Sequence, residues 1–579
     1  MALLFLLGGV IRGVVLEEGT GMPVEHVRVE GRSVDYTDEN GKFVVEAEEG
    51  DTIRIFHPGY ERMEIPACDS VVIYLKPRII PLPGTVVKGK KTYEKKITAR
   101  ELHEEPGFPD IFRLLEVTPS VSALAEWAGF LSIRGGRFCE TGYLVDGVPF
   151  PFPFHFMGIT GIFPVEEIER ISVYPSFSWR LPEWRIGGTV DIQTREPEKK
   201  WEVSITPLDA WMGLGVSGGR IGLRHHLGKY WLGKLNQDFM LVPGYTDLSL
   251  RGKGYFLFTS EEKTEVSGDM NFTVGQSLWY SYFKIHPFIF YGWVREGEIG
   301  TRDRKSTEEE IVKGALAEKG NLSFGAEWIE YSGKGMNFYY LTSLSSEVSF
   351  LRRFVSLSGE EVLGEWLARW RIKMEVYPER VVWSPGVKIF WRNFYLVHAV
   401  SSQYFYETGE GIKTIKKKAL GFAWEKGYIE GYMRSGEDFL LGMEACFRGR
   451  YGGLSLSFMR SSDKNPYSIP WSLNALLILP FRNFYASFIW KAVSERYSLL
   501  MFEGGSRYTM DVPAYSRMDM ELGYRGKSIS WECGVVNLQN RANILAYVVD
   551  DNEIYPVISI PRIIYAGISV TIDPVLPQH

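Results

Sequence analysis

The sequence predicts a mainly β protein with three parts: a small β-sandwich, a compact α/β domain and a closed transmembrane antiparallel β-barrel of about 22 strands. Aromatic residues make up 14% of the 579 residues and Gly contributes 60, a combination that favours β-structure over helical bundles. The mean hydropathy of −0.11 excludes a polytopic helical membrane protein. It does not exclude a barrel, because barrel strands alternate and their polarity averages out.

Long runs of alternating polarity begin at about Trp201. In the clearest run, apolar residues occupy every second position and charged residues lie between them. Its apolar face consists of Trp366, Ala368, Trp370, Ile372, Met374 and Val376, and its charged face of Arg369, Arg371, Lys373 and Glu375. Similar runs cover 266–274 and 517–525. A helix could not bury one face with a period of two, so we interpret these runs as strands.

Strand length separates two interpretations of this alternation, because a soluble sandwich with an inward apolar face would give the same pattern. Globular strands peak at about five or six residues, whereas a tilted membrane-spanning strand needs about nine to eleven. We therefore assign 198–579 to a barrel, and roughly 17 residues per strand and connection give roughly 22 strands around a plugged lumen. We expect Trp366, Trp370 and Met374 to face lipid, and long polar connections at 296–321 and 407–418.

The N-terminal residues predict a possible signal-peptide remnant followed by a sandwich. The uncharged run from Met1 to Ile11 is too short to cross a bilayer as a helix. It fits the core of a signal peptide, with 1–10 as its remnant, or alternatively a first β-strand. Residues 11–77 show short alternating runs separated by turn residues such as Asn40-Gly41, which predicts the β-sandwich.

Residues 78–97 are basic and interrupted by Pro and Gly, as expected of a linker. Within them, Thr85, Val86 and Val87 form a short β-prone patch. It is either a buried strand of a neighbouring domain or an exposed strand that can be added to a partner's sheet.

Residues 98–197 predict the compact α/β domain. A short helix is expected from Pro109 through Leu115, and strands at 131–136, 142–150, 168–175 and 187–195. Residues 147–165 carry no charge, but prolines at positions 149, 151, 153 and 164 rule out a membrane helix there.

Charge and residue spacing argue against several function classes. Lys plus Arg number 65 against 71 for Asp plus Glu, and the net charge of −6 makes nucleic acid an unsuitable partner. The four cysteines are far apart with no CxxC spacing, and no His is followed by Glu three residues on, as a zinc hydrolase pair would require. We predict isolated thiols, no catalytic residues, no metal site and no cofactor.

Three stretches carry a family resemblance. The most specific contains DIFRLLEVTPSVSA, LSIRGGRFCETGYLVDGVPF, HFMGITGIFPVEEIERISVYPS and GGTVDIQTR. The others are the barrel end, with RMDMELGYRG, VVNLQNRANI and IPRIIYAGISVTI, and the linker segment LPGTVVKGKK. Together they resemble TonB-dependent outer-membrane receptors. The segments IRGVVLEEGTGMPVEHVRVEG, YTDENGKF and FHPGYE resemble a carboxypeptidase-regulatory-like domain, an immunoglobulin-like module that some of these receptors carry at the N-terminus.

The resemblance implies a plug at 98–197 inside the barrel. Its recurring turns are Arg134-Gly135-Gly136 and Asp146-Gly147. It also implies that the Thr85 patch is a TonB-box-like segment, with a TonB-like energy-transducing protein and outer-membrane lipid as partners. The implied function is import of a scarce small-molecule ligand across the bacterial outer membrane, with the N-terminal domain in the periplasm. Siderophore-like metal chelates, cobalamin-like compounds and oligosaccharides are the ligand classes.

Two other functions stay open at the level of sequence. A structural or adhesive outer-membrane barrel without energised transport would have the same strands. A secreted soluble glycan-binding β-protein would also be rich in strands and aromatic residues.

The candidate ligand site is the segment after Asp146-Gly147. It consists of Phe150, Phe152, Phe154, His155 and Phe156. Intervening prolines hold the chain extended, so the first three rings lie at period two with little entropy left to lose on binding. Alternatively, the rings pack the plug against the barrel wall. A lone histidine is a poor metal ligand and is more often a hydrogen-bonded structural residue.

Overall fold

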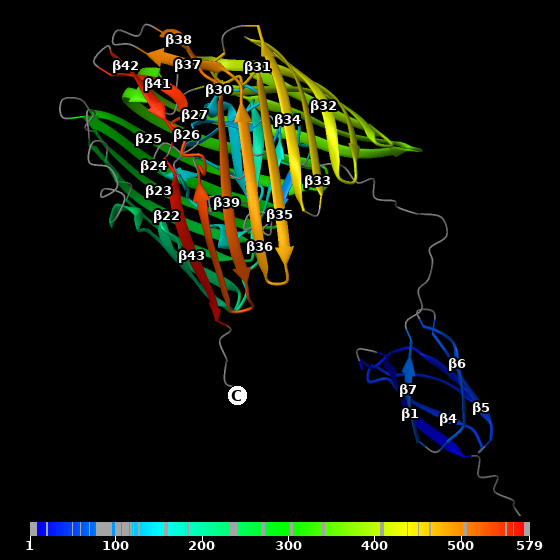
Figure 1. Cartoon of the computed structure of the whole chain (residues 1–579). Coiled ribbons are helices and arrows are strands. Elements are labelled where there is room, and N and C mark those ends of the chain that lie inside the picture. Colours follow the sequence, from blue (N-terminus) through cyan, green and yellow to red (C-terminus); the bar gives the residue numbers. More distant parts are fainter. Residues whose placement is uncertain are drawn as a thin grey trace, which may run out of the picture. The chain divides into compact units, whose positions relative to one another are not determined.

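Figure 1 shows the computed structural model of the chain. The structure describes residues 9–18, 21–48, 50–57, 60–68, 70–76, 95–98, 106, 110, 115, 118–119, 121–125, 128–151, 153–155, 160–179, 181, 185–230, 240–242, 244–267, 272–301, 305–337, 342–405, 410–436, 438–449, 451–462, 465–501, 507–550, 553–559 and 561–572. The chain falls into two compact units, Met1–Lys90 and Lys91–His579.

Two β-sheets enclose the core of the first unit. Their strand orders are β4-β1-β7 and β3-β2-β5-β6. The strands are β1 (Val10–Glu17), β2 (Arg28–Glu30), β3 (Val34–Tyr36), β4 (Lys42–Glu46), β5 (Thr52–Phe56), β6 (Met63–Pro66) and β7 (Ser70–Leu75). In β4, Phe43 and Val45 are buried while Val44 is exposed. This period of two gives each sheet one apolar face, and the two faces share one core.

The second unit begins with an inner domain, the name we use for residues 95–197. Its central sheet has the order β12-β11-β16-β15-β8, and two hairpins, β9-β10 and β13-β14, accompany it. The strands are β8 (Lys95–Thr98), β9 (Val121–Ala125), β10 (Ala128–Ile133), β11 (Thr141–Val145), β12 (Val148–Phe150), β13 (Phe154–His155), β14 (Thr160–Gly161), β15 (Ile168–Tyr174) and β16 (Gly188–Thr194). Short 3-10 helices are η1 (Phe138–Glu140) and η3 (Val165–Glu167). In Figure 1 these strands, in cyan, lie within the ring of later strands.

Of the four strands predicted in the inner domain, 131–136, 168–175 and 187–195 correspond to β10, β15 and β16, whereas the run 142–150 is a hairpin of β11 and β12. Of the helix predicted from Pro109 through Leu115, only Asp110 and Leu115 are described, and Leu115 is helical whereas Asp110 is not. No helix in the described part of the chain is long and apolar enough to cross a bilayer.

The remainder of the second unit is a closed antiparallel barrel. Its strands are β17 (Trp201–Ile205), β18 (Asp209–Val216), β19 (Gly219–His226), β20 (Met240–Val242), β21 (Tyr245–Gly252), β22 (Tyr255–Ser267), β23 (Phe272–Ile285), β24 (Phe288–Thr301), β25 (Lys305–Lys319), β26 (Leu322–Asn337), β27 (Thr342–Leu363), β28 (Trp366–Val376), β29 (Val381–Trp391), β30 (Phe394–Phe405), β31 (Gly411–Trp424), β32 (Gly427–Ser435), β33 (Phe439–Gly449), β34 (Gly452–Ser461), β35 (Trp471–Phe481), β36 (Phe484–Val493), β39 (Tyr515–Arg525), β40 (Ile529–Val536) and β43 (Ile563–Ile572). β20 and β21 follow one another along the same partner, β22, so the 23 segments make 22 strands among the described residues. The predicted strand number is therefore confirmed.

Closure joins the first and last strands, with Trp201 opposite Ile572. Every barrel strand then has two hydrogen-bonding neighbours and leaves no open sheet edge, which is the condition for a β-structure surrounded by lipid.

The two ends of the barrel differ in their connections. One end, which we call the turn end, has tight turns such as Ser217-Gly218 and Gly320-Asn321, and the positive φ of Gly218 (83°) and Gly320 (60°) suits hairpin turns. The opposite loop end carries two extra hairpins, seen at the top of Figure 1. They are β37 (Arg496–Met501) with β38 (Arg507–Val512), and β41 (Ile544–Asp550) with β42 (Glu553–Ile558). A further short helix is η4 (Gly228–Tyr230).

The predicted alternation in β28 is confirmed. Trp366 faces outward with 50% of its surface exposed, whereas Arg371 and Glu375 face the lumen with 3% and 0% exposed. Trp370 and Met374 share the outward face with Trp366.

Three sequence interpretations were wrong. The expected connection at 296–321 lies mostly in β24 and β25, and the one at 407–418 continues into β31. The run 266–274, read as one strand, spans the end of β22 and the start of β23. Near the loop end, strands carry polar residues on both faces, so the sequence there does not distinguish a strand from a solvated loop.

Candidate functional site

The Arg134-Gly135-Gly136 turn lies against the barrel wall. Arg134 and Gly135 have positive φ values of 50° and 68°. A Cβ atom on Gly135 would lie 2.5 Å from the Leu440 side chain of β33, and one on Gly136 would lie 2.5 Å from the guanidinium of Arg434 of β32. Glycine therefore allows the inner domain to approach the wall closely at this turn.

Arg134 itself is buried between wall carboxylates. Its guanidinium pairs with Glu430 of β32 and, at 2.9 Å, with Glu444 of β33, and it lies 4.0 Å from the centroid of the Tyr432 ring. Burial alone would lower the pKa of Arg134, but the two carboxylates outweigh burial and raise it. This ion cluster fixes the turn to two adjacent wall strands.

The Asp146-Gly147 turn joins β11 to β12 and also contacts the wall. Both residues have positive φ, 52° and 79°. Asp146 accepts a hydrogen bond from the Thr194 backbone amide at 2.9 Å and from the Tyr282 hydroxyl of β23 at 2.7 Å. Lys284, also of β23, donates to the Asp146 carbonyl at 2.6 Å. One carboxylate thus supports the turn and connects it to the barrel.

The predicted aromatic ligand site lies in the protein core where it is described. Phe150 and Phe154 are fully buried. The Phe150 ring lies 4.4 Å from the Tyr280 ring of β23, centroid to centroid. These rings pack the inner domain against the wall, which was the alternative interpretation of the segment. Phe152 and Phe156 lie outside the described residues, and a ligand contact for this segment stays a prediction.

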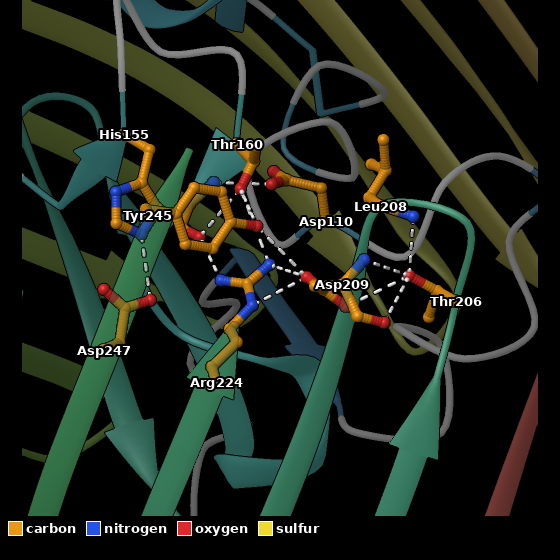
Figure 2. Close-up of polar contacts among 10 residues, drawn as sticks. Asp110, His155, Thr160, Thr206, Leu208, Asp209, Arg224, Tyr245 and Asp247 are labelled. Carbon is orange, nitrogen blue, oxygen red and sulfur yellow. Dashed lines mark hydrogen bonds and ion pairs between the residues drawn. The ribbon is translucent and has the colours of Figure 1, made fainter. Parts of the chain in front are cut away.

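His155 occupies a polar niche in the same interface (Figure 2). Its Nε2 atom lies 2.9 Å from Asp247 of β21, its Nδ1 atom lies 3.4 Å from Glu262 of β22, and its ring stacks on Tyr245 at 3.7 Å between centroids. Burial alone would lower the pKa of His155, but the two carboxylates raise it to about 9. The sequence shows no carboxylate beside His155; the fold brings two from distant strands.

Arg224 of β19 completes this polar contact, as Figure 2 shows. Its Nε donates to Asp209 of β18 at 2.7 Å, and its Nη1 donates to the Gly161 carbonyl of the inner domain at 2.6 Å. The Gly161 amide in turn donates to Asp110 at 2.5 Å. Charged side chains of β18, β19, β21 and β22 therefore hold the β13-β14 hairpin of the inner domain.

Sequence reasoning missed these wall partners. They are Asp209, Arg224, Asp247, Glu262, Glu430 and Glu444. The available signal was a charged residue at the lumen-facing position of an alternating strand. That signal gives the face but not the partner, because Arg134 and Glu430 are separated by 296 positions.

A small pocket with a cavity volume of about 20 Å³ lies between the inner domain and the wall strands β24 to β27 and β30. The inner domain contributes Arg185, and the wall contributes Arg352 and a group of aromatic rings. The Tyr404 ring lies 5.0 Å from Phe350 and 5.6 Å from Tyr377, centroid to centroid. Tyr377 directly follows β28, so this part of the pocket is at the loop end.

At the pocket, strand β27 extends beyond the end of its neighbour β28. Pairing of β27 with β28 begins at Arg353 opposite Val376, so residues 342–352 of β27 continue past the end of β28. Arg352 donates to Glu327 at 2.7 Å and to Glu375 at 3.0 Å. The pocket is thus lined by flat rings and by a guanidinium whose charge is already balanced by two carboxylates.

The remaining predictions concern the linker patch, metal sites and the cysteines. Thr85, Val86 and Val87 lie outside the described residues. Within the described ranges, no three His, Cys, Asp or Glu side chains are grouped closely enough to hold a metal ion. All four cysteines are free thiols, as predicted.

No family model and no curated protein matches the sequence. Solved structures do match. A mutant of the ferric enterobactin receptor PfeA from Pseudomonas aeruginosa covers 83% of this chain and 98% of its own length at 12% identity and a TM-score of 0.58. The siderophore receptor PirA from Acinetobacter baumannii covers 84% of this chain and 99% of its own length, at 14% identity and a TM-score of 0.58. The ferric citrate transporter FecA in unliganded form covers 84% of this chain and 98% of its own length, at 13% identity and a TM-score of 0.57. The chain therefore has the fold of these receptors and transporters.

Proposed function

We propose that this chain is a receptor of the bacterial outer membrane that imports a scarce nutrient by energised movement of its inner domain. The observation that carries the proposal is a closed barrel whose lumen holds a folded domain fixed by ion pairs and hydrogen bonds. A filled lumen gives a solute no open path, so passage requires the inner domain to move. The inner domain is then the plug, and a passive porin is the wrong class.

Ion pairs and hydrogen bonds between the inner domain and the barrel wall suit a domain that must move. When an ion pair such as Arg134 with Glu444 separates, water can solvate both groups. Exposing apolar surface to water has no such compensation. We therefore expect the contacts in Figure 2 to restrain the plug at rest and to exchange with water during transport.

The geometry of β8 supports coupling through the linker. Among the described residues, β8 is the edge strand of the central sheet and pairs with β15 alone, from Thr98 opposite Arg170 to Lys95 opposite Val173. Thr85, Val86 and Val87 precede it by about ten residues. A TonB-like protein that pairs with this patch would pull first on an edge strand held by one ladder. In this arrangement the N-terminal sandwich lies in the periplasm.

The ligand class is proposed from the matching structures. Those structures are described as receptors and transporters of ferric enterobactin, siderophores and ferric citrate. A metal chelate of the siderophore type is therefore the first ligand class of the proposal. Cobalamin-like compounds and oligosaccharides remain the other ligand classes of the proposal.

The test is growth and uptake in a strain with and without this protein. Iron supplied only as ferric siderophore, cobalamin at a limiting level, and oligosaccharide as sole carbon source form the three arms. The proposal expects growth to depend on the protein in at least one arm, first in the ferric arm. Identical growth in all three arms would favour a structural or adhesive barrel. Recovery of unheated protein in water without detergent would favour the secreted glycan-binding alternative.

A further inference from the structure

The outward face of β28 to β33 carries its basic side chains in one small cluster. Lys416 and Lys418 of β31 and His398 of β30 are exposed on this face, and His398 lies directly opposite Lys418. Other outward strand positions across these six strands are apolar or uncharged, for example Val387 beside His398 and Met433 beside Lys418.

Lys416 and Lys418 carry charge of the same sign. Across the described residues, no carboxylate pairs with Lys416, Lys418 or His398. Two outward lysines elsewhere on the barrel have carboxylate partners: Lys263 lies 3.2 Å from Glu265, and Lys305 lies 2.7 Å from Glu298. The two lysine charges repel each other, and the part of the chain that the structure describes provides no anion to balance them.

The height of the cluster places it against lipid. Strand β31 ends at the turn end with Trp424, and Phe422 and Leu420 follow on the outward face. At about 3.3 Å per residue and a tilt of about 40°, Lys418 lies roughly 15 Å and Lys416 roughly 20 Å above Trp424, within an apolar band about 25 Å tall. On the neighbouring β29, outward apolar residues continue from Trp391 to Val381. The lysine stems can extend their ammonium groups toward the nearer headgroup layer.

From this arrangement we infer that Lys416, Lys418 and His398 bind the phosphate of an anionic membrane lipid in the leaflet at the loop end of the barrel. The inference rests on the proposed membrane location and not on transport. Cross-strand neighbours place the Lys418 and His398 Cβ atoms about 5 Å apart, and Lys416 about 7 Å along the strand, a spacing at which donors can share one phosphate. The acyl chains would lie on the surrounding apolar face.

The experiment is native mass spectrometry of the full chain in neutral detergent, titrated with phosphatidic acid or with phosphatidylcholine of the same acyl chains. Wild-type protein should bind phosphatidic acid at least tenfold more tightly. The Lys416→Gln, Lys418→Gln double variant should lose this preference. The matched control is Lys263→Gln with Lys305→Gln, which removes two outward lysines that already have carboxylate partners and should keep the preference.

Each outcome decides the inference. An equal preference in wild type and the Lys416→Gln, Lys418→Gln variant overturns it, as does loss of the preference in the control variant. Displacement of the lipid by inorganic phosphate at equal concentration would show a site for free phosphate and would also overturn it. A gel shift between unheated and boiled samples checks that each variant is a folded barrel. Because no step measures uptake, failure here leaves the proposed transport function unaffected.

Discussion

At the scale of single residues, the plug is positioned by buried charges that need their partners. Replacing Arg134 with Gln leaves Glu430 and Glu444 buried without their cation. Removing one partner of a buried ion pair costs about 3 to 5 kcal/mol, so we expect a clear loss of stability in detergent. Arg392→Gln is the control, because its pair with Glu365 is exposed and an exposed pair contributes at most about 1 kcal/mol. Equal thermal unfolding of the two variants would contradict the account of Arg134.

The raised pKa of His155 predicts that the stability of the folded protein declines as the pH rises. Its pKa is about 9 in the folded protein against 6.5 for the free group, so its charged form favours folding. That contribution, on the order of 3 kcal/mol, is complete below about pH 6.5 and disappears as the pH rises through about 9. His155→Gln should therefore lower stability at pH 6 and flatten its decline toward pH 9. The exposed His26 serves as control, and His26→Gln should retain the wild-type decline. A His155→Gln protein that still shows this decline would exclude His155 as its source.

The sequence predicts the backbone conformation of turn residues better than it predicts contacts between distant residues. Local backbone demands are visible in sequence, and the Arg134-Gly135-Gly136 and Asp146-Gly147 turns adopt the positive φ that glycine-containing turns require. Long-range polar contacts are not visible, because a lumen-facing Glu430 has the same local pattern as any other inward charge. The polar environment of His155 was missed for this reason.

At the scale of elements, the outward face of β28 predicts where charge is tolerated. Trp370 lies midway along this strand on the outward face. Arg at a lipid-facing position near the midplane costs about 2 to 4 kcal/mol, so Trp370→Arg should lower the free energy of unfolding by that amount. Thr307→Arg in β25 is the control, since Thr307 is exposed beside the lysine and glutamate residues near the loop end. Urea unfolding of both variants in lipid vesicles is the measurement. Equal values would mean that β28 does not face hydrocarbon.

Strand prediction succeeded where only one face was polar and failed where both were. Alternation in β28 and β39 was sufficient because lipid and lumen demand opposite polarity. The segment 296–321 contains many Glu, Lys and Thr residues because β24 and β25 extend toward the loop end with polar residues on both faces. There the ladder of backbone hydrogen bonds, and not side-chain polarity, keeps the chain extended.

At the scale of the whole molecule, three features support the proposed transport. The barrel is closed, a folded domain fills its lumen through polar contacts, and that domain begins with an edge strand at the end of the linker. Fold class and strand number could be read from the sequence because length and period constrain them strongly. The pocket could not, because it combines Arg185 of the inner domain with residues from five wall strands and with Tyr377, which follows β28.

The most direct test of this account is uptake of a radiolabelled ferric siderophore by cells that carry the wild-type chain or Val86→Pro. Proline removes the main-chain donor that pairing with a partner strand requires. We predict that Val86→Pro, like dissipation of the proton-motive force, abolishes uptake while the ligand still binds at the cell surface. Uptake by Val86→Pro at the wild-type rate, or uptake that persists after the proton-motive force is dissipated, would contradict energised plug movement as the function of this protein.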